Sequence, residues 1–171
     1  MARVYLLTGG NTGKTEATLR RAQRMVNSNI GVILHASGIY KTLPWGFNAE
    51  GLFYNQALEV DTDLSPEEVL DEVQIIERTL GRDRQREAMV KRESGEAYAS
   101  RPIDIDIIFY DDIVMETPLL TIPHPRMHER SFVLTPLGEI APEKVHPLLH
   151  KTVGELMDEL RDKEMEEQKG K

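Results

Sequence analysis

The chain has 171 residues, a formal net charge of −8 and no cysteine. This length is typical of one domain, large enough to bury roughly two-thirds of its unfolded surface. The lack of cysteine excludes disulfides, thiol chemistry and cysteine-ligated zinc. The acidic charge argues against general nucleic-acid binding, and no apolar run reaches the ~18 residues of a membrane span. We therefore expect a monomeric, cytoplasmic protein that binds neither nucleic acid nor membrane.

Positive charge is concentrated in two short segments of this acidic chain. The first segment carries Arg82, Arg84, Arg86, Lys91, Arg92 and Arg101, and the second carries His124, Arg126, His128 and Arg130. Local positive charge on an acidic protein suits a small polyanionic ligand better than a long one.

The first part of the chain alternates apolar runs with polar turns. The predicted order is a strand at 3–7, a turn at 8–11, a helix at 14–26, a strand at 30–40, a loop at 41–51 and a strand at 54–61. A second helix has clear boundary signals. Ser65 and Glu68 form a capping box around Pro66, and Gly81 ends the helix.

The second part of the chain begins with a polar segment, 83–99, which predicts a long loop with room for a short helix. It continues with a strand at 103–110, short strands at 113–115 and 119–122, an apolar stretch at 130–137, a helix at 153–160 and a charged tail at 161–171 that we expect to fray.

The order strand, helix, strand, strand, helix, strand predicts an α+β fold of the ferredoxin-like type. Its antiparallel sheet would carry two helices on one face and leave the opposite face free for a site. We expect one domain over residues 1–160.

The central feature of the sequence is the strand that contains Asp104 and Asp106. Isoleucines alternate with these two aspartates, so both carboxylates lie on one face, roughly 6.6 Å apart along the strand. Carboxylates at this spacing repel unless a cation lies between them, and hard oxygen ligands suit Mg²⁺ with substrate phosphates. Arg101 adds a phosphate partner beside the first aspartate. The simpler alternative is an edge strand with a solvated polar face.

The segment from Thr8 to Thr15 resembles a phosphate-binding P-loop, because it lies between a strand and a helix and contains Gly13-Lys14-Thr15. The pattern requires glycine where Thr8 stands, and Gly9 comes one residue late. A glycine-rich turn into a helix is therefore the favoured interpretation.

The remaining candidates each have a structural alternative. Arginines in a loop are often solvated, but Arg82, Arg84, Arg101 and Arg130 together could neutralise a triphosphate. Asn55 offers a donor and an acceptor to a heterocyclic amide edge, and Phe53 and Phe132 could stack on a flat ring or belong to the core.

These pieces together resemble the 6-hydroxymethyl-7,8-dihydropterin pyrophosphokinase family of folate biosynthesis, over residues 4–142. The resemblance rests on Gly9-Gly10-Asn11, Ser37–Thr42, Phe53-Tyr54-Asn55, Gln74 with Glu77, Gly81–Arg84, Ala99–Ile108, Ile122–Met127 and Arg130-Ser131-Phe132.

The resemblance implies a transfer of the β,γ-diphosphate of ATP to the pterin hydroxymethyl group, which leaves AMP. It places two Mg²⁺ ions on Asp104 and Asp106, and the transferred diphosphate beside Arg82 and Arg101. The implied nucleotide site comprises Gln74, Glu77, Arg84, Tyr98, Arg101, Ile107, Thr121, His124 and Arg130. The implied pterin site comprises Thr42, Leu43, Trp45, Phe53, Asn55 and Phe132.

Two other functions stay open at this point. A P-loop nucleotidase would depend on Lys14 and release ADP, and a pterin- or nucleotide-binding module would bind without turnover. The intact aspartate pair and the arginines favour the enzyme, because a pure binder has no use for two metal ions.

Overall fold

The computed structural model describes residues 1–42, 52–94 and 101–170. Its elements, in chain order, are β1 (Ala2–Gly10), α1 (Thr15–Asn29), β2 (Gly31–Ala36), β3 (Tyr40–Thr42), β4 (Phe53–Thr62), α2 (Pro66–Thr79), α3 (Arg84–Ser94), β5 (Asp104–Tyr110), β6 (Met115–Glu116), β7 (Thr121–Ile122), the 3-10 turn η1 (Met127–Glu129), α4 (Ser131–Ile140) and α5 (Val153–Lys169).

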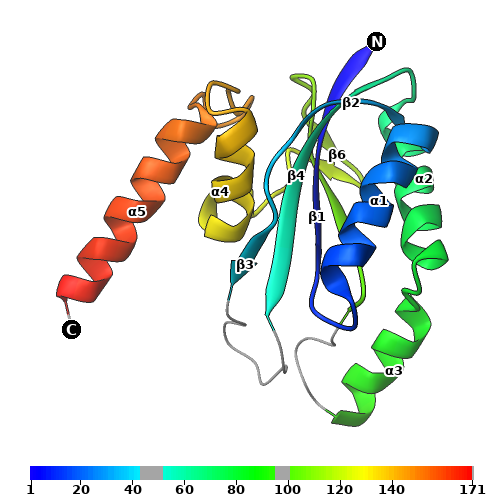
Figure 1. Cartoon of the computed structure of the whole chain (residues 1–171). Coiled ribbons are helices and arrows are strands. Elements are labelled where there is room, and N and C mark those ends of the chain that lie inside the picture. Colours follow the sequence, from blue (N-terminus) through cyan, green and yellow to red (C-terminus); the bar gives the residue numbers. More distant parts are fainter. Residues whose placement is uncertain (43–51, 95–100, 171) are drawn as a thin grey trace.

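The main sheet is antiparallel, with the strand order β2-β4-β1-β5 and with β3 paired to β4 (Figure 1). With α1 after β1 and α2 after β4, this is the ferredoxin-like arrangement that the order of elements predicts. Strands β6 and β7 form a separate pair.

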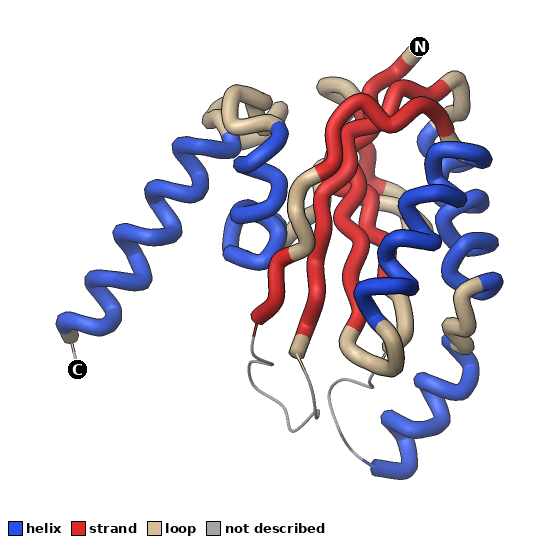
Figure 2. The backbone as a smooth tube through the Cα atoms, in the orientation of Figure 1, coloured by secondary structure: helices blue, strands red, loops and turns tan. Residues whose placement is uncertain are grey.

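Helices cover both faces of the sheet (Figure 2). Helices α1 and α2 pack on one face, where Leu19, Val26 and Ile76 are fully buried. On the opposite face α4 packs on β4, and α5 packs on α4. The expectation of a free second face was therefore wrong. The apolar stretch at 130–137 forms most of α4, and its buried leucines need a partner surface.

Helix α2 begins and ends at the residues that the sequence indicates. Ser65 accepts from the backbone N–H of Glu68, and Glu68 accepts in return from Ser65. Gly81 has a φ of 102°, a left-handed conformation that glycine adopts without steric cost. The end of α2 is thereby fixed directly before Arg82.

Three segments differ from their sequence-based prediction. The strand expected at 30–40 is two strands, β2 and β3. Most of the expected loop at 83–99 is the helix α3, which begins where Asp83 accepts from the backbone N–H of Arg86. The tail expected to fray at 161–171 instead continues α5 to Lys169. Helix α3 and the end of α5 are rich in exposed charged residues with high helix propensity, so neither segment shows the apolar period that marks a packed helix.

None of the helices in the described part of the chain is long and apolar enough to cross a membrane.

Candidate active site

The candidate site lies at the end of the sheet where β1 ends and β5 begins. Gly9 of β1 is paired with Asn55 of β4 on one side and with Asp104 of β5 on the other. Paired residues in an antiparallel sheet direct their side chains to the same face, so Asn55 and Asp104 flank the glycine. A Cβ at Gly9 would lie 2.5 Å from Nδ2 of Asn55. Glycine therefore leaves room for the amide of Asn55 to lie over this position.

Asp104 and Asp106 lie on one face of β5, as their spacing predicts. Ile105 and Ile107 point the other way, into the core beneath α1 and α2. The side chain of Ile107 is therefore buried on the face opposite the two carboxylates. Its expected place in the nucleotide site stays a prediction.

Arg82 is the most extensively paired side chain of the site, and it is almost completely buried. Its Nη1 donates to Glu77 Oε2 and to Asp104 Oδ1, both at 2.8 Å. Its Nε and Nη2 donate to the two carboxylate oxygens of Glu87, at 3.0 and 3.2 Å. Arg82 thus joins α2, α3 and β5 at the site. Glu87, which the sequence did not single out, is the partner from α3.

Glu77 is the second buried member of this network. It is buried, accepts from Arg84 Nη2 at 2.9 Å, and accepts from the backbone N–H of Ile105 at 2.9 Å. A buried carboxylate with these donors is fully paired. Glu77 therefore holds β5 and two arginines in place, and the contacts of its carboxylate are internal to the protein.

Negative charge is concentrated around the aspartate pair. Burial, and then the charges of Asp104 and Glu77, raise the pKa of Asp106 to about 7, against the opposing effect of Arg130 and Arg101. Asp104 presents its other oxygen, Oδ2, to Arg101 Nη1 at 3.2 Å. A carboxylate that ionises reluctantly beside a second carboxylate is stabilised by a bound cation. The donor set therefore fits a hard divalent ion. Within the described residues no cluster of three or more His, Cys, Asp or Glu forms a closed metal site.

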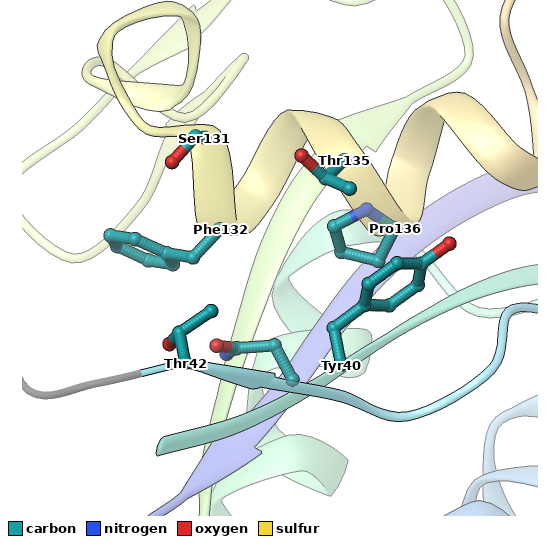
Figure 3. Close-up of a pocket in the computed structure, with 7 residues that line it drawn as sticks. Tyr40, Thr42, Ser131, Phe132, Thr135 and Pro136 are labelled. Atoms are coloured by element: carbon teal, nitrogen blue, oxygen red, sulfur yellow. The ribbon is translucent and has the colours of Figure 1, made fainter. Parts of the chain in front are cut away.

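A small pocket that is open to solvent lies beside Asn55, between β3, β4 and α4 (Figure 3). The residues that line it are Tyr40, Thr42, Asn55, Ser131, Phe132, Thr135 and Pro136. Three residues of the expected pterin site, Thr42, Asn55 and Phe132, are thus brought together. Phe53 is paired with Thr42 across β3 and β4 and is half-buried.

Three α4 residues of this wall were not expected to contribute. Ser131 lies within the motif Arg130-Ser131-Phe132 but was not assigned to the site, and Thr135 and Pro136 belong to no motif. The packing of α4 on β4 places all three in the pocket. Tyr40 lay within the resemblance but was not expected to contribute.

Two of the other expected nucleotide residues, His124 and Arg130, lie close enough to the aspartate pair to interact with it electrostatically. The backbone N–H of His124 donates to the carbonyl of Ile108 at 3.0 Å, which holds this histidine against β5. Burial, and then the nearby Arg130, lower the pKa of His124 and favour its neutral form. Arg130 lies over the ring of Phe132, 5.6 Å from its centroid. Thr121 is part of β7, and Gln74 is half-buried on α2, one turn before Glu77.

Leu43, Trp45 and Tyr98, which the resemblance also assigns to the site, lie outside the described residues.

The glycine-rich segment 8–15 is not built as a phosphate cradle. Gly9 and Gly10 belong to β1. Gly9 is paired with a strand on each side, and Gly10 packs against the backbone of Pro102. The hydroxyl of Thr15, which would bind a metal ion in a P-loop, donates to the carbonyl of Thr12 in its own turn. The structure therefore supports the glycine-rich turn and not the P-loop.

This turn instead fixes the backbone of Arg101. The backbone N–H of Asn11 donates to the Arg101 carbonyl at 2.9 Å, and the Arg101 N–H donates to Asn11 Oδ1 at 2.8 Å. At Gly10 a Cβ would lie 2.6 Å from the carbonyl oxygen of Pro102, so only glycine permits this close approach.

With this geometry established, comparison with known proteins identifies the family. Residues 5–142 match the family model described as 7,8-dihydro-6-hydroxymethylpterin-pyrophosphokinase (HPPK). The chain belongs to this family. It is 38% identical over 148 residues to a 2-amino-4-hydroxy-6-hydroxymethyldihydropteridine pyrophosphokinase of Porphyromonas gingivalis, a match that covers 86% of this chain and 95% of the relative.

More distant matches are to longer proteins. The chain is 37% identical to the folic acid synthesis protein FOL1 of Dictyostelium discoideum over 90% of its own length and 22% of the relative. A crystal structure described as HPPK-DHPS in complex with substrates superimposes with a TM-score of 0.74 at 16% identity. It covers 96% of this chain, which spans only 44% of that protein, and at this identity the likeness concerns the fold.

Proposed function

We propose that Asp104, Asp106, Arg82 and Arg101 form the diphosphate-transfer centre of this pyrophosphokinase of folate biosynthesis. ATP is the co-substrate, and 6-hydroxymethyl-7,8-dihydropterin is the acceptor. The hydroxymethyl oxygen attacks the β-phosphorus of ATP and its proton passes to water, while the bond between that phosphorus and the α,β-bridging oxygen breaks and AMP leaves. Transfers of this kind depend mainly on positioning and on neutralisation of charge, so no strong protein base is required.

Asp104 and Asp106 would hold two Mg²⁺ ions, with water and phosphate oxygens as the other ligands. Bound there, such ions lower the pKa of the hydroxyl and stabilise the entering and leaving oxygens. The raised pKa of Asp106, caused first by burial and then by the charges of Asp104 and Glu77, supports this assignment, because a bound cation would favour the ionised carboxylate.

Arg82 and Arg101 would neutralise the diphosphate. Both now donate to Asp104, Arg82 to Oδ1 and Arg101 to Oδ2. If Asp104 held a cation through these oxygens, the arginine donors that now face them would be available to phosphate.

The two substrates would lie on either side of Gly9. We assign the nucleotide to Gln74, Arg84, Thr121, His124 and Arg130, and the pterin to Thr42, Phe53, Asn55 and Phe132. The single observation that carries the proposal is the shared row of Asn55, Gly9 and Asp104. It supports a pterin site at the pocket beside Asn55, next to the aspartate pair.

Product analysis tests the proposal. Purified protein is incubated with ATP, Mg²⁺ and the hydroxymethyl-dihydropterin, and nucleotides are separated by chromatography. We expect AMP only when the pterin is present, and none after chelation of the metal. Formation of ADP, or turnover that survives chelation, would contradict it.

We also propose a monomeric, cytoplasmic enzyme, on the basis of its charge and hydropathy.

A further inference from the structure

Glu139, near the end of α4, connects this helix to a segment about a hundred residues earlier in the chain. Its two carboxylate oxygens accept from the backbone N–H of Gly38, at 3.3 and 3.1 Å. Its Oε1 also accepts from the hydroxyl of Tyr40 at 2.6 Å. Neither the motifs of the sequence nor the residues assigned to the substrates include Glu139.

The two elements that Glu139 connects, β3 and α4, both line the pocket. Tyr40 lines it from β3, and Pro136, one helical turn before Glu139, lines it from α4; Figure 3 shows these two side chains next to each other. Tyr40 is also the strand partner of Asn55. Glu139 is therefore hydrogen-bonded to the residue that is paired with Asn55 in the sheet.

Strand β3 needs such a support. It has only 3 residues, and within the described chain it pairs with β4 alone. So short a strand is held weakly by its ladder. Helix α4, in contrast, is anchored in the core by Leu134 and Leu137. Glu139 thus connects the weakly held strand β3 to the well-packed helix α4, so that the position of the strand depends on that of the helix.

We propose that Glu139 is a positioning residue for the pterin: it sets the distance between β3 and α4 and so the width of the pocket. This inference rests on the proposed location of the pterin. Glu139 is exposed and its partners are solvent-accessible, so its hydrogen bonds contribute little to global stability. Their effect is local, on Tyr40 and Thr42.

The test is a comparison of Glu139→Ala, Glu139→Gln and Tyr40→Phe in steady-state kinetics with both substrates varied. We expect Glu139→Ala to raise the KM for the pterin about tenfold, since the pocket loses its support, while kcat and the KM for ATP change less than about twofold. Glu139→Gln keeps one acceptor oxygen and should have an intermediate effect. Tyr40→Phe and Glu139→Ala should be non-additive, because they remove the same contact.

Glu143→Gln is the matched control, since this glutamate is also exposed and follows α4. Equal losses for both substrates, or a lowered Tm with reduced kcat, would overturn the positioning role. Asn55→Ala separates the two proposals. If Asn55→Ala leaves pterin affinity unchanged, the pterin lies elsewhere. If Asn55→Ala weakens it and Glu139→Ala does not, the inference about Glu139 is wrong.

Discussion

At the scale of single residues, the notable feature is that Asp104 is hydrogen-bonded to two arginines. Each of its oxygens accepts from a different arginine, and one of these, Arg82, is also held by Glu77 and Glu87. Removal of one member of such a network leaves buried charges unpaired. The aspartates are therefore expected to be more sensitive to substitution than their partial exposure suggests.

We predict that Asp104→Asn and Asp106→Asn each lower kcat by about a hundredfold or more, because each removes a charged oxygen from the proposed cation site. AMP formation measures the effect. Asp71→Asn, an exposed aspartate on α2, is the matched control. Lys14→Ala should keep its activity, and loss of activity there would revive the P-loop hypothesis.

Asn11 is the second residue with a predicted effect on catalysis. Asn11→Ala removes the acceptor that holds the backbone of Arg101, so we expect kcat to fall about tenfold. Asn27→Ala provides a close control, because Asn27 Oδ1 also accepts a backbone N–H, that of Ile33, but far from the site. If both variants lose stability and neither loses kcat, the role of Asn11 is only structural.

At the scale of elements, the turn between α4 and α5 depends on a neutral histidine. Nδ1 of the buried His146 accepts from the backbone N–H groups of Leu148 and Leu149, both at 3.1 Å. Burial, and then the neighbouring His128 and His150, lower the pKa of His146. The ring packs edge-on against Phe109, which joins this turn to the sheet.

The lowered pKa predicts a loss of stability in acid. Below the ordinary histidine pKa of about 6.5 the unfolded chain binds this proton and the folded chain does not, so the free energy of unfolding falls as pH decreases. We expect His146→Asn, which keeps an acceptor but does not titrate, to lose less stability between about pH 7 and pH 5. Urea unfolding at both pH values measures this. The control is His35→Asn, because His35 is exposed on β2 and is not among the groups that lower the pKa of His146. Equal pH dependence in the wild type and both variants would contradict the assignment to His146.

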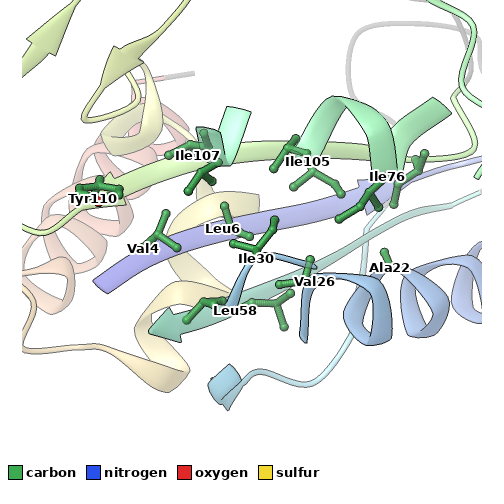
Figure 4. Packing of buried hydrophobic residues seen from close by; sticks show 14 of the residues in the cluster. Val4, Leu6, Ala22, Val26, Ile30, Leu58, Ile76, Ile105, Ile107 and Tyr110 are labelled. Atoms are coloured by element: carbon green, nitrogen blue, oxygen red, sulfur yellow. The ribbon is translucent and has the colours of Figure 1, made fainter. Parts of the chain in front are cut away.

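At the scale of the whole molecule, the sheet separates two cores. Figure 4 shows the first, in which Leu6, Leu58 and Ile105 of the strands meet Val26 and Ala22 of α1 and Ile76 of α2. The second lies between the sheet, α4 and α5, and includes Phe109, Leu134 and Leu137. The site occupies the end of this second face, where Gly9, Asp104 and Asn55 replace apolar side chains.

Because both faces are packed, we predict that Leu137→Ala in α4 and Leu19→Ala in α1 have similar costs. Each residue is almost completely buried, and each substitution should lower the free energy of unfolding by about 2–5 kcal/mol. Urea denaturation at neutral pH gives both values. If Leu137→Ala costs less than about 1 kcal/mol, α4 is not a true part of the core.

The sequence by itself determined the features that depend on near neighbours in the chain. The period of two around Asp104 and Asp106 indicated their common face, and Ser65, Pro66, Glu68 and Gly81 indicated the bounds of α2. The motifs also indicated the family. Such signals are strong because strand alternation and helix capping are local interactions.

Only the tertiary structure decided which distant groups meet. The pairing of Arg82 with Asp104, the hold of Asn11 on Arg101 and the contact of Glu139 with Tyr40 join residues 22, 90 and 99 positions apart. The charged helix α3 and the cover of the second face by α4 also had no usable local signal. The chemical nature of a side chain is set by its residue type. The group that it contacts depends on how the elements pack, and packing is a property of the whole fold.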